Sequence, residues 1–363
     1  MNEKHEEGRG ATRLQKFYLS LLVLVILSSG CAKEGVVKSS IILETEDYIV
    51  LPVYYGTDRN ITGDKAYGYI HSDTLDMGMC MVSIPKKHKR GIAESPSMWR
   101  SEDPAEHVVL QKTMPQRREN FFTNLRRQEK SEVLIFIHGF NTTFEDSVRR
   151  TAQIAYDLNF KGQAVTYSWP SKGDVSPSGY VHDKDIIGAS TNHLRDFLLA
   201  IASESGASTV HIITHSMGNV ILTKALALIA NQALAKPLFA EIMLIAPDMN
   251  VDEFKTAEFR KTAKRVTLYA SSKDKALMIS KEINGGLRRA GDADEEIIVL
   301  PGMDTIDVSN VDTSLMGHTY FGDNNSVIAD IYQLLKGLSP FNRSLVPKTL
   351  RDTKYWIFQP PVK

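Results

Sequence analysis

The stretch TVHIITHSMG at residues 209–218 places a serine between an apolar run of strand length and a predicted helix over about residues 218–230. A tight strand-to-helix turn of this kind raises a serine hydroxyl above a sheet, and the amide that follows the serine faces an oxyanion. Ser216 is therefore the candidate nucleophile, with the Met217 N–H as one oxyanion donor. Taken alone, Ser216 could equally be a helix N-cap, because serine is favoured at that position.

The turn needs small residues two places on either side of the serine, because strand and helix nearly touch there. Gly218 meets this requirement. Thr214 is bulkier than the usual glycine; a β-branched residue suits a strand end but must find room beneath the helix.

Other apolar runs of strand length alternate with helical patterns on both sides of this turn. Strands are expected at residues 133–137, 164–169, 209–214, 241–247, 265–271 and 295–301, and helices at about 143–158, 184–203, 218–230 and 326–335. Strands that are apolar on both faces and alternate with helices specify a mostly parallel sheet covered on two sides. The sequence therefore predicts a doubly wound α/β fold.

A second oxyanion donor is expected where the strand at 133–137 ends in HGF, residues 138–140. In folds of this type, an amide in the turn before the first helix points at the oxyanion, which assigns the Phe140 N–H. Each such donor is worth about 3 kcal/mol in a dry site. The side chain of His138 is expected to be structural and hydrogen-bonded to backbone, because the amides do the electrostatic work.

A serine hydroxyl needs a base, and the base needs a carboxylate that fixes its tautomer. The chain order in these folds is serine, acid, histidine. Of the ten histidines, His318 alone follows Ser216, so it is the predicted base. Asp274 follows the penultimate strand and is the preferred acid. Asp248 is the alternative acid, although it could instead cap the next helix.

The first thirty residues predict a signal peptide. An apolar run at 17–27 follows basic residues and precedes small ones, and eleven apolar residues are too few for a membrane span of about 20. The ending LSSGC resembles a bacterial lipobox, with Ser28 where leucine is usual, so cleavage before Cys31 and lipidation of Cys31 are expected. Two acyl chains would anchor the protein stably in the cell envelope, and Ala32 weakly favours the periplasmic side of the outer membrane.

Domain boundaries follow from the changes in pattern along the chain. After the signal peptide at 1–30, we expect a tether at 31–49, a β-rich extension and connector at 50–130, a catalytic domain at 131–340 and a tail at 341–363.

Composition limits the partners. The 43 Lys and Arg balance 43 Asp and Glu, so no global field would draw the chain to nucleic acid. Two cysteines cannot make a disulfide framework. The sequence has no HExxH motif, paired CxxC or glycine-rich phosphate loop, so neither a metal nor another cofactor is expected. The oligomeric state is not predicted.

Several segments agree in order with the bacterial α/β-hydrolase family of unknown function, whose members are often called esterase or lipase-like proteins. They are VYYGTDRN at 53–60, VSIP at 82–85, residues 136–158, YSWPSKG at 167–173, HSMGN at 215–219, APDMN at 246–250, LYASSKDKAL at 268–277, RRAGD at 288–292 and GHTYF at 317–321. The resemblance covers roughly residues 50–340. It implies an α/β-hydrolase fold with a Ser216, Asp274, His318 triad, but it supplies no substrate.

The expected reaction is hydrolysis of a carboxylic ester through an acyl-enzyme on Ser216, with a small molecule or lipid as substrate. An acyltransferase or amidase on the same triad is one alternative. A non-catalytic envelope scaffold is the other.

Overall fold

The computed structural model describes residues 43–63, 66–96, 100–126, 132–232, 234–294, 296–311 and 325–358. The predicted signal peptide, Cys31 and His318 lie outside these ranges. Within them, no helix is both long and apolar enough to cross a bilayer.

The described strands form one mixed sheet, in the order β11-β12-β10-β9-β8-β7-β5-β6-β2-β3-β4, with β1 paired to β2. The strands from β12 to β2 in this order run parallel, and the flanking pairs are antiparallel. Their bounds are β1 Leu43–Glu44, β2 Tyr48–Thr62, β3 Ala66–Pro85, β4 Val109–Gln116, β5 Glu132–Ile137, β6 Gln163–Ser168, β7 Thr209–His215, β8 Phe239–Ile245, β9 Ala263–Ala270, β10 Asp304–Asp307, β11 Leu345–Leu350 and β12 Thr353–Phe358.

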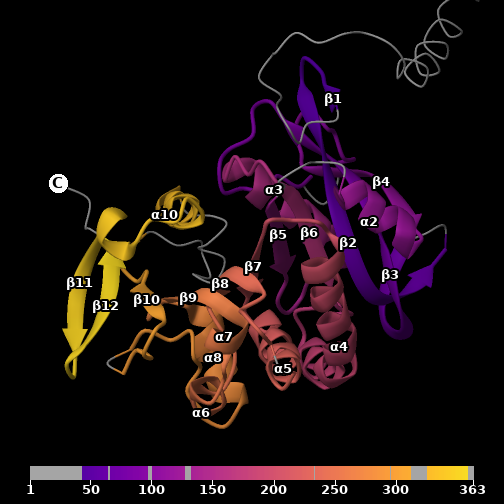
Figure 1. Cartoon of the computed structure of the whole chain (residues 1–363). Coiled ribbons are helices and arrows are strands. Elements are labelled where there is room, and N and C mark those ends of the chain that lie inside the picture. Colours follow the sequence, from indigo (N-terminus) through magenta and orange to yellow (C-terminus); the bar gives the residue numbers. More distant parts are fainter. Residues whose placement is uncertain are drawn as a thin grey trace, which may run out of the picture. The chain divides into compact units, whose positions relative to one another are not determined.

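Helices cover both faces of this sheet (Figure 1). One face packs against α2, α4, α5, α6 and α7, and the other against α3 and α10. The bounds are α2 Arg118–Arg126, α3 Phe144–Asp157, α4 Pro177–Glu204, α5 Gly218–Ala230, α6 Val251–Lys255, α7 Phe259–Thr262, α8 Lys275–Ile283, α10 Asn325–Leu335 and the 3₁₀ turn η2 Pro340–Asn342. The predicted α/β architecture is confirmed.

Local sequence explains where the helices begin. Thr143 caps α3 in a reciprocal capping box with Asp146. Helix α4 begins at Pro177, earlier than expected, because the Ser176 side chain accepts a hydrogen bond from the Gly179 N–H and proline suits the first helical position.

One predicted strand is wrong. Residues 296–301 form turn and irregular backbone, and the strand beside β9 is β10, Asp304–Asp307. Ile297 and Ile298 are buried, which explains the apolar run, but their backbone belongs to a loop whose Ile298 carbonyl accepts from the Thr305 hydroxyl at 2.8 Å. An apolar run alone does not distinguish a strand from a buried loop.

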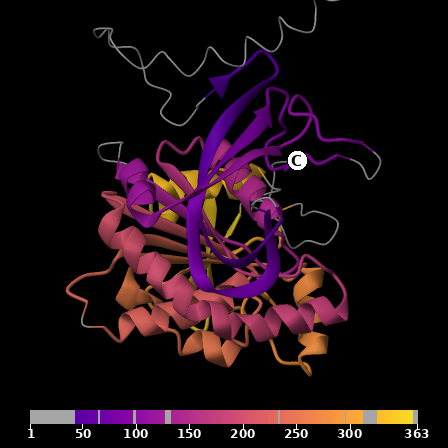
Figure 2. The same ribbon diagram turned by 90° about the vertical axis from the view of Figure 1, so that its right-hand side faces the viewer.

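Both ends of the described chain add strands to the sheet. Strand β2 pairs with β6, with Tyr54 opposite Val165, so β2 continues the parallel centre and β3 and β4 extend it with antiparallel pairs. The long β2–β3 hairpin runs beside α4 (Figure 2). At the other edge, the β11–β12 hairpin pairs with β10, where a tail was expected. The domain boundaries themselves stay predictions.

The parallel register brings several loops to one edge, which we call the carboxyl edge. Ile137 lies opposite Thr214, and Ile245 lies opposite both His215 and Tyr269. The loops after β5, β7, β8, β9 and β10 therefore leave the sheet together, where ligands bind in open α/β sheets.

Candidate active site

Ser216 occupies a strained turn between β7 and α5. Its φ is +52°, a value that non-glycine residues adopt rarely. The Ser216 N–H donates to the Ile245 carbonyl at 3.0 Å, and the Ser216 carbonyl accepts from Asn219 Nδ2 at 2.9 Å. These bonds hold a costly backbone conformation, which is typical of functional sites. Among the described residues, no group is hydrogen-bonded to Ser216 Oγ.

The contacts around the turn explain its small residues. A Cβ added to Gly218 would lie 2.4 Å from the His138 carbonyl oxygen, and one added to Gly139 would lie 2.7 Å from Ser216 Cβ. The expected close approach at Gly218 is therefore present. Thr214 is a residue of β7 and is fully buried, so its larger side chain is accommodated. Its hydroxyl has no hydrogen-bond partner among the described residues.

The two amides predicted as oxyanion donors belong to residues that lie beside the contact between Gly139 and Ser216. Phe140 directly follows Gly139, and Met217 is the N-cap residue of α5, without a side-chain capping bond. Among the described residues, neither N–H has a hydrogen-bond acceptor. Both donors are thus available to a ligand, and their role stays a prediction.

Backbone strain is shared by three neighbouring strand ends. Asn141 after β5, Ser216 after β7 and Ala246 after β8 have φ values of +56°, +52° and +44°. Each such conformation costs of order 1–3 kcal/mol and persists only where the surroundings impose it. The carboxyl edge is therefore a strained part of the sheet.

Asp274, the predicted acid, lies on the same edge after β9. It is the N-cap of α8, and its Oδ1 accepts from the Leu277 N–H at 3.0 Å. The side chain is buried, with 1% exposure.

Asp248, the alternative acid, has its backbone bonded to that of the predicted nucleophile, and its side chain forms an ion pair with Arg289. Its N–H donates to the Ser216 carbonyl at 3.2 Å. Its Oδ1 accepts from Arg289 Nε at 2.7 Å and from Ser280 Oγ at 2.5 Å. The next helix is capped by Asn250, so the alternative that Asp248 caps it is wrong. This buried ion pair indicates a structural role for Asp248.

His318 lies outside the described residues, but the chain that leads to it leaves the sheet at the carboxyl edge. The loop after β10 is tied to the loop after β9, since the Ser272 N–H donates to Ser309 Oγ at 2.8 Å. Ser272 stands two residues before Asp274, and Ser309 nine before His318. A contact between Ser216 and His318 stays a prediction.

His138 is a structural histidine, as expected. Its Nδ1 donates to the Gly139 carbonyl at 2.8 Å, and its ring stacks on Trp169 at 5.0 Å. Trp169 is fully buried and donates from Nε1 to the His138 carbonyl. Burial, followed by the nearby Arg59 charge, lowers the pKa of His138 to about 3. The imidazole is therefore neutral at ordinary pH.

Arg59 was not predicted from the sequence, and its guanidinium holds the loops beside the site. Its Nη2 donates to the Thr142 carbonyl at 2.8 Å, and its Nη1 donates to the Ser171 carbonyl at 2.9 Å. A third bond joins Nε to Ser168 Oγ at 2.9 Å. Burial lowers the pKa of Arg59 to about 9. This guanidinium links β2 to the loops after β5 and β6, and the only signal for it was the segment VYYGTDRN.

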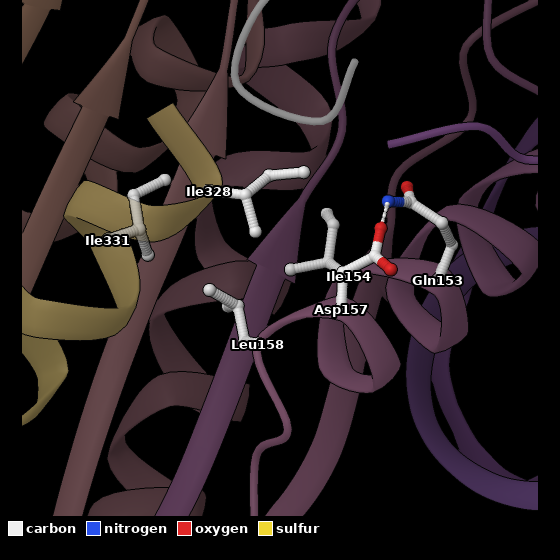
Figure 3. A pocket seen from close by; sticks show the side chains of 6 residues that line it. All are labelled: Gln153, Ile154, Asp157, Leu158, Ile328 and Ile331. Carbon is white, nitrogen blue, oxygen red and sulfur yellow. Dashed lines mark hydrogen bonds between the residues drawn. The ribbon is translucent and has the colours of Figure 1, made fainter. Parts of the chain in front are cut away.

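One small pocket lies between α3 and α10 (Figure 3). Ile154 and Leu158 of α3 face Ile328 and Ile331 of α10 across it. Its volume of about 10 Å³ gives room for roughly one water molecule. The pocket contains no predicted site residue and is a packing gap.

The sheet order, the strained serine turn and the glycine contacts define the class of α/β hydrolases. A family model described as "Alpha/beta hydrolase of unknown function (DUF900)" matches residues 114–336. The chain belongs to this family, which confirms the resemblance found in the sequence. Among curated proteins, no significant match is found.

The solved structures that this chain is similar to include hydrolases, at low identity and low TM-score. The phospholipase PlaB from Legionella pneumophila is 13% identical with a TM-score of 0.37, over 63% of this chain and 68% of its own. A putative hydrolase of the α/β superfamily from Xanthomonas campestris pv. campestris is 14% identical with a TM-score of 0.31, over 57% and 99%. Est1E from Butyrivibrio proteoclasticus is 13% identical with a TM-score of 0.30, over 58% and 89%. At these values the likeness says nothing about substrate.

Proposed function

We propose that this chain hydrolyses carboxylic esters through an acyl-enzyme on Ser216. The observation that carries the proposal is the positive φ of Ser216, held between Gly139 and Gly218, where the chain bends so tightly that no larger residue fits. A helix N-cap serine needs no such strain, because N-cap residues ordinarily have extended backbone.

The mechanism assigns one role to each group. His318 takes the Ser216 hydroxyl proton as Oγ attacks the acyl carbonyl carbon, and Asp274 holds the imidazole in the required tautomer. The Phe140 and Met217 amides donate to the oxyanion. The tetrahedral intermediate then expels the alcohol, which takes the proton from His318. Water repeats the sequence and releases the acid.

Apolar surface near the predicted acid favours a substrate with an apolar acyl group. Exposed apolar side chains at the start of α4 and along α8 include Val175, Val181, Met278, Ile279 and Ile283. Hydrogen bonds between their polar side chains show that the start of α4 lies beside α8.

Two bonds show this. Tyr180 Oη of α4 lies 3.1 Å from Ser280 Oγ of α8 and accepts from Asn284 Nδ2 at 2.9 Å. The Tyr180 ring also packs edge-on against Phe140 at 5.5 Å. The apolar side chains of these two elements therefore lie on the elements that pack, through the buried Tyr180 ring, against the residue of the predicted oxyanion donor, which suits an acyl chain or a lipid.

The test is hydrolysis of p-nitrophenyl esters of increasing acyl length by the full chain, purified in detergent. Ser216→Ala is expected to lower kcat at least about 10⁴-fold. Ser203→Ala is the matched control, since Ser203 lies exposed on α4 and donates only within its own helix. Full activity of Ser216→Ala would refute the proposal.

We also propose that the enzyme is held in the bacterial cell envelope by lipidated Cys31, on the sequence evidence alone. Labelling with a radioactive fatty acid is expected in the natural chain and absent in Cys31→Ser. Equal labelling of both would contradict the anchor.

A further inference from the structure

The β2–β3 hairpin and α4 bring three metal-ligating side chains together away from the predicted triad. We call Asp58 of β2, His71 of β3 and His193 of α4 the histidine cluster. Asp58 Oδ2 lies 3.6 Å from His71 Nε2 and 3.6 Å from His193 Nδ1. One ligand atom from each residue lies within 4.8 Å of the others.

The carboxylate of this cluster is buried without a hydrogen bond of normal length. Burial and the Asp58 carboxylate raise the pKa of the nearby Tyr167, but the Tyr167 hydroxyl donates to the Ser190 carbonyl at 3.4 Å. Asp58 is fully buried, and neither of its oxygens has a hydrogen-bond partner among the described residues. The facing nitrogens, His71 Nε2 and His193 Nδ1, are also buried and unbonded within the described chain. The separations of 3.6 Å are too long for hydrogen bonds. A buried carboxylate in this state is costly unless a cation or a proton accompanies it.

The neighbouring Arg59 does not supply that cation by direct contact. Its guanidinium is committed to Ser168, Ser171, Thr142 and Gly68. Its charge acts on Asp58 only at longer range.

The tautomer of His193 points to a cation. His193 Nε2 lies 3.2 Å from the Asp73 carbonyl oxygen, so this nitrogen carries the hydrogen and donates it. In the neutral ring, Nδ1 then presents a lone pair to the Asp58 carboxylate. Two electron-rich atoms facing each other repel, whereas both can bind one metal ion. Metal-bound histidines usually donate their second N–H to a carbonyl or carboxylate in this way.

A bulge in the β2–β3 hairpin places Asp58 and His71 in the cluster. The register of the hairpin is regular up to the pair Thr57–Asp76 and resumes at Arg59–His71, so extra residues of β3 stand opposite Asp58. Such bulges re-aim side chains near sites. The carbonyl of Asp73, within the bulge, is the one that orients His193.

We propose that the histidine cluster binds one divalent transition-metal ion, best fitted by Zn²⁺. Two imidazoles and one carboxylate are common zinc ligands, and bonds of about 2.1 Å in a tetrahedron place ligand atoms about 3.4 Å apart. The two histidine side chains are 19% and 20% exposed, whereas the ligand atoms themselves are buried, so the cluster lies just beneath the surface. The ion would join β2 and β3 to α4. This site is independent of the proposed hydrolase function.

The alternative occupant is a proton. The Asp58 carboxylate raises the pKa of His193, against the opposing effect of burial. In that case the cluster is an ion pair of imidazolium and carboxylate, and it binds no metal.

Calorimetric titration of the untagged, chelator-treated full chain with ZnCl₂ decides between them. We expect one ion per chain. Its Kd should be at least about 100-fold weaker in Asp58→Asn and His193→Gln, because loss of a residue that only hydrogen-bonds a metal ligand already weakens binding by about 10- to 100-fold. His107→Gln, remote in sequence from the cluster, and Ser216→Ala should bind normally. Circular dichroism checks the fold of each variant. Replacement by Co²⁺ should give the visible absorption of a tetrahedral ion in the natural chain.

Absence of binding to the natural chain would overturn the proposal, whatever the variants do. So would unchanged affinity in His193→Gln. Because Ser216→Ala retains the metal site, loss of ester hydrolysis in that variant with normal zinc binding separates the two proposals.

Discussion

The carboxyl edge and the histidine cluster each carry a free-energy cost in the folded chain, but the two costs have different origins. At the carboxyl edge the cost lies in the backbone, where Asn141, Ser216 and Ala246 adopt positive φ. In the histidine cluster no ligand residue has positive φ, but Asp58 is a buried carboxylate without hydrogen bonds in the described chain. Backbone strain of this kind is typical of residues that take part in catalysis, whereas a buried charge without hydrogen bonds indicates that an ion of opposite charge binds there. Variants that affect one region and spare the other test this distinction.

The largest effect is expected for the base. His318→Ala should lower the rate of ester hydrolysis by about 10⁴-fold, because Ser216 then lacks a proton acceptor. Zinc binding by the histidine cluster should be unchanged. Steady-state kinetics measure the first and calorimetric titration the second. A residual rate within tenfold of the natural chain would contradict the role of His318.

The next largest effects should distinguish the two buried aspartates, Asp274 and Asp248, by whether their loss lowers activity or stability. Asp274→Asn should lower kcat by about 10³–10⁴-fold, with little change in unfolding free energy, because the asparagine Oδ1 can still accept the capping bond from the Leu277 N–H. Asp248→Asn should chiefly destabilise the fold, by about 3–5 kcal/mol, because the buried Arg289 guanidinium loses its counter-charge. Kinetics and urea unfolding of both variants measure this. The reverse pattern would make Asp248 the acid.

A smaller loss is expected for Gly139→Ala. The added methyl would meet Ser216 Cβ at 2.7 Å and displace either the nucleophile or the Phe140 turn. A displacement of this size can cost about 100-fold in rate. Gly188→Ala on α4, where no atom lies within 4 Å of the added Cβ, is the matched control. Equal kcat/KM in both variants would show that the contact is not needed.

The smallest effect concerns acid stability. Because the pKa of His138 is lowered to about 3 in the fold, its stabilising contribution is complete above its unfolded value of about 6.5 and is lost as pH falls toward 3. The slope is about 1.4 kcal/mol per pH unit below 6.5. Unfolding free energies between pH 7 and pH 5 should show this slope in the natural chain and in His107→Asn, and a shallower one in His138→Asn. Parallel curves would mean that His138 is not held neutral.

The sequence predicted the carboxyl edge well because its information is local. Ser216 stands directly between an apolar strand and a helix, and parallel strands bring their ends together by topology. A strand was wrongly predicted at residues 296–301, because Ile297 and Ile298 are buried in a loop and a buried loop can show the same apolar pattern as a strand.

The histidine cluster could not be predicted in the same way. Asp58, His71 and His193 are far apart in the chain and follow no metal-ligand spacing. They meet through a strand bulge and the packing of a hairpin on α4, which depend on tertiary structure. Arg59 was missed for the same reason, since its acceptors are carbonyls of distant loops.

The central claim is that Ser216 is a nucleophile activated by His318, and a fluorophosphonate probe tests it most directly. After exposure of the full chain to the probe, peptide mass mapping should find one adduct, on Ser216, in the natural chain and almost none in His318→Ala. An adduct on another residue, or equal labelling of Ser216 in the two chains, would contradict the account.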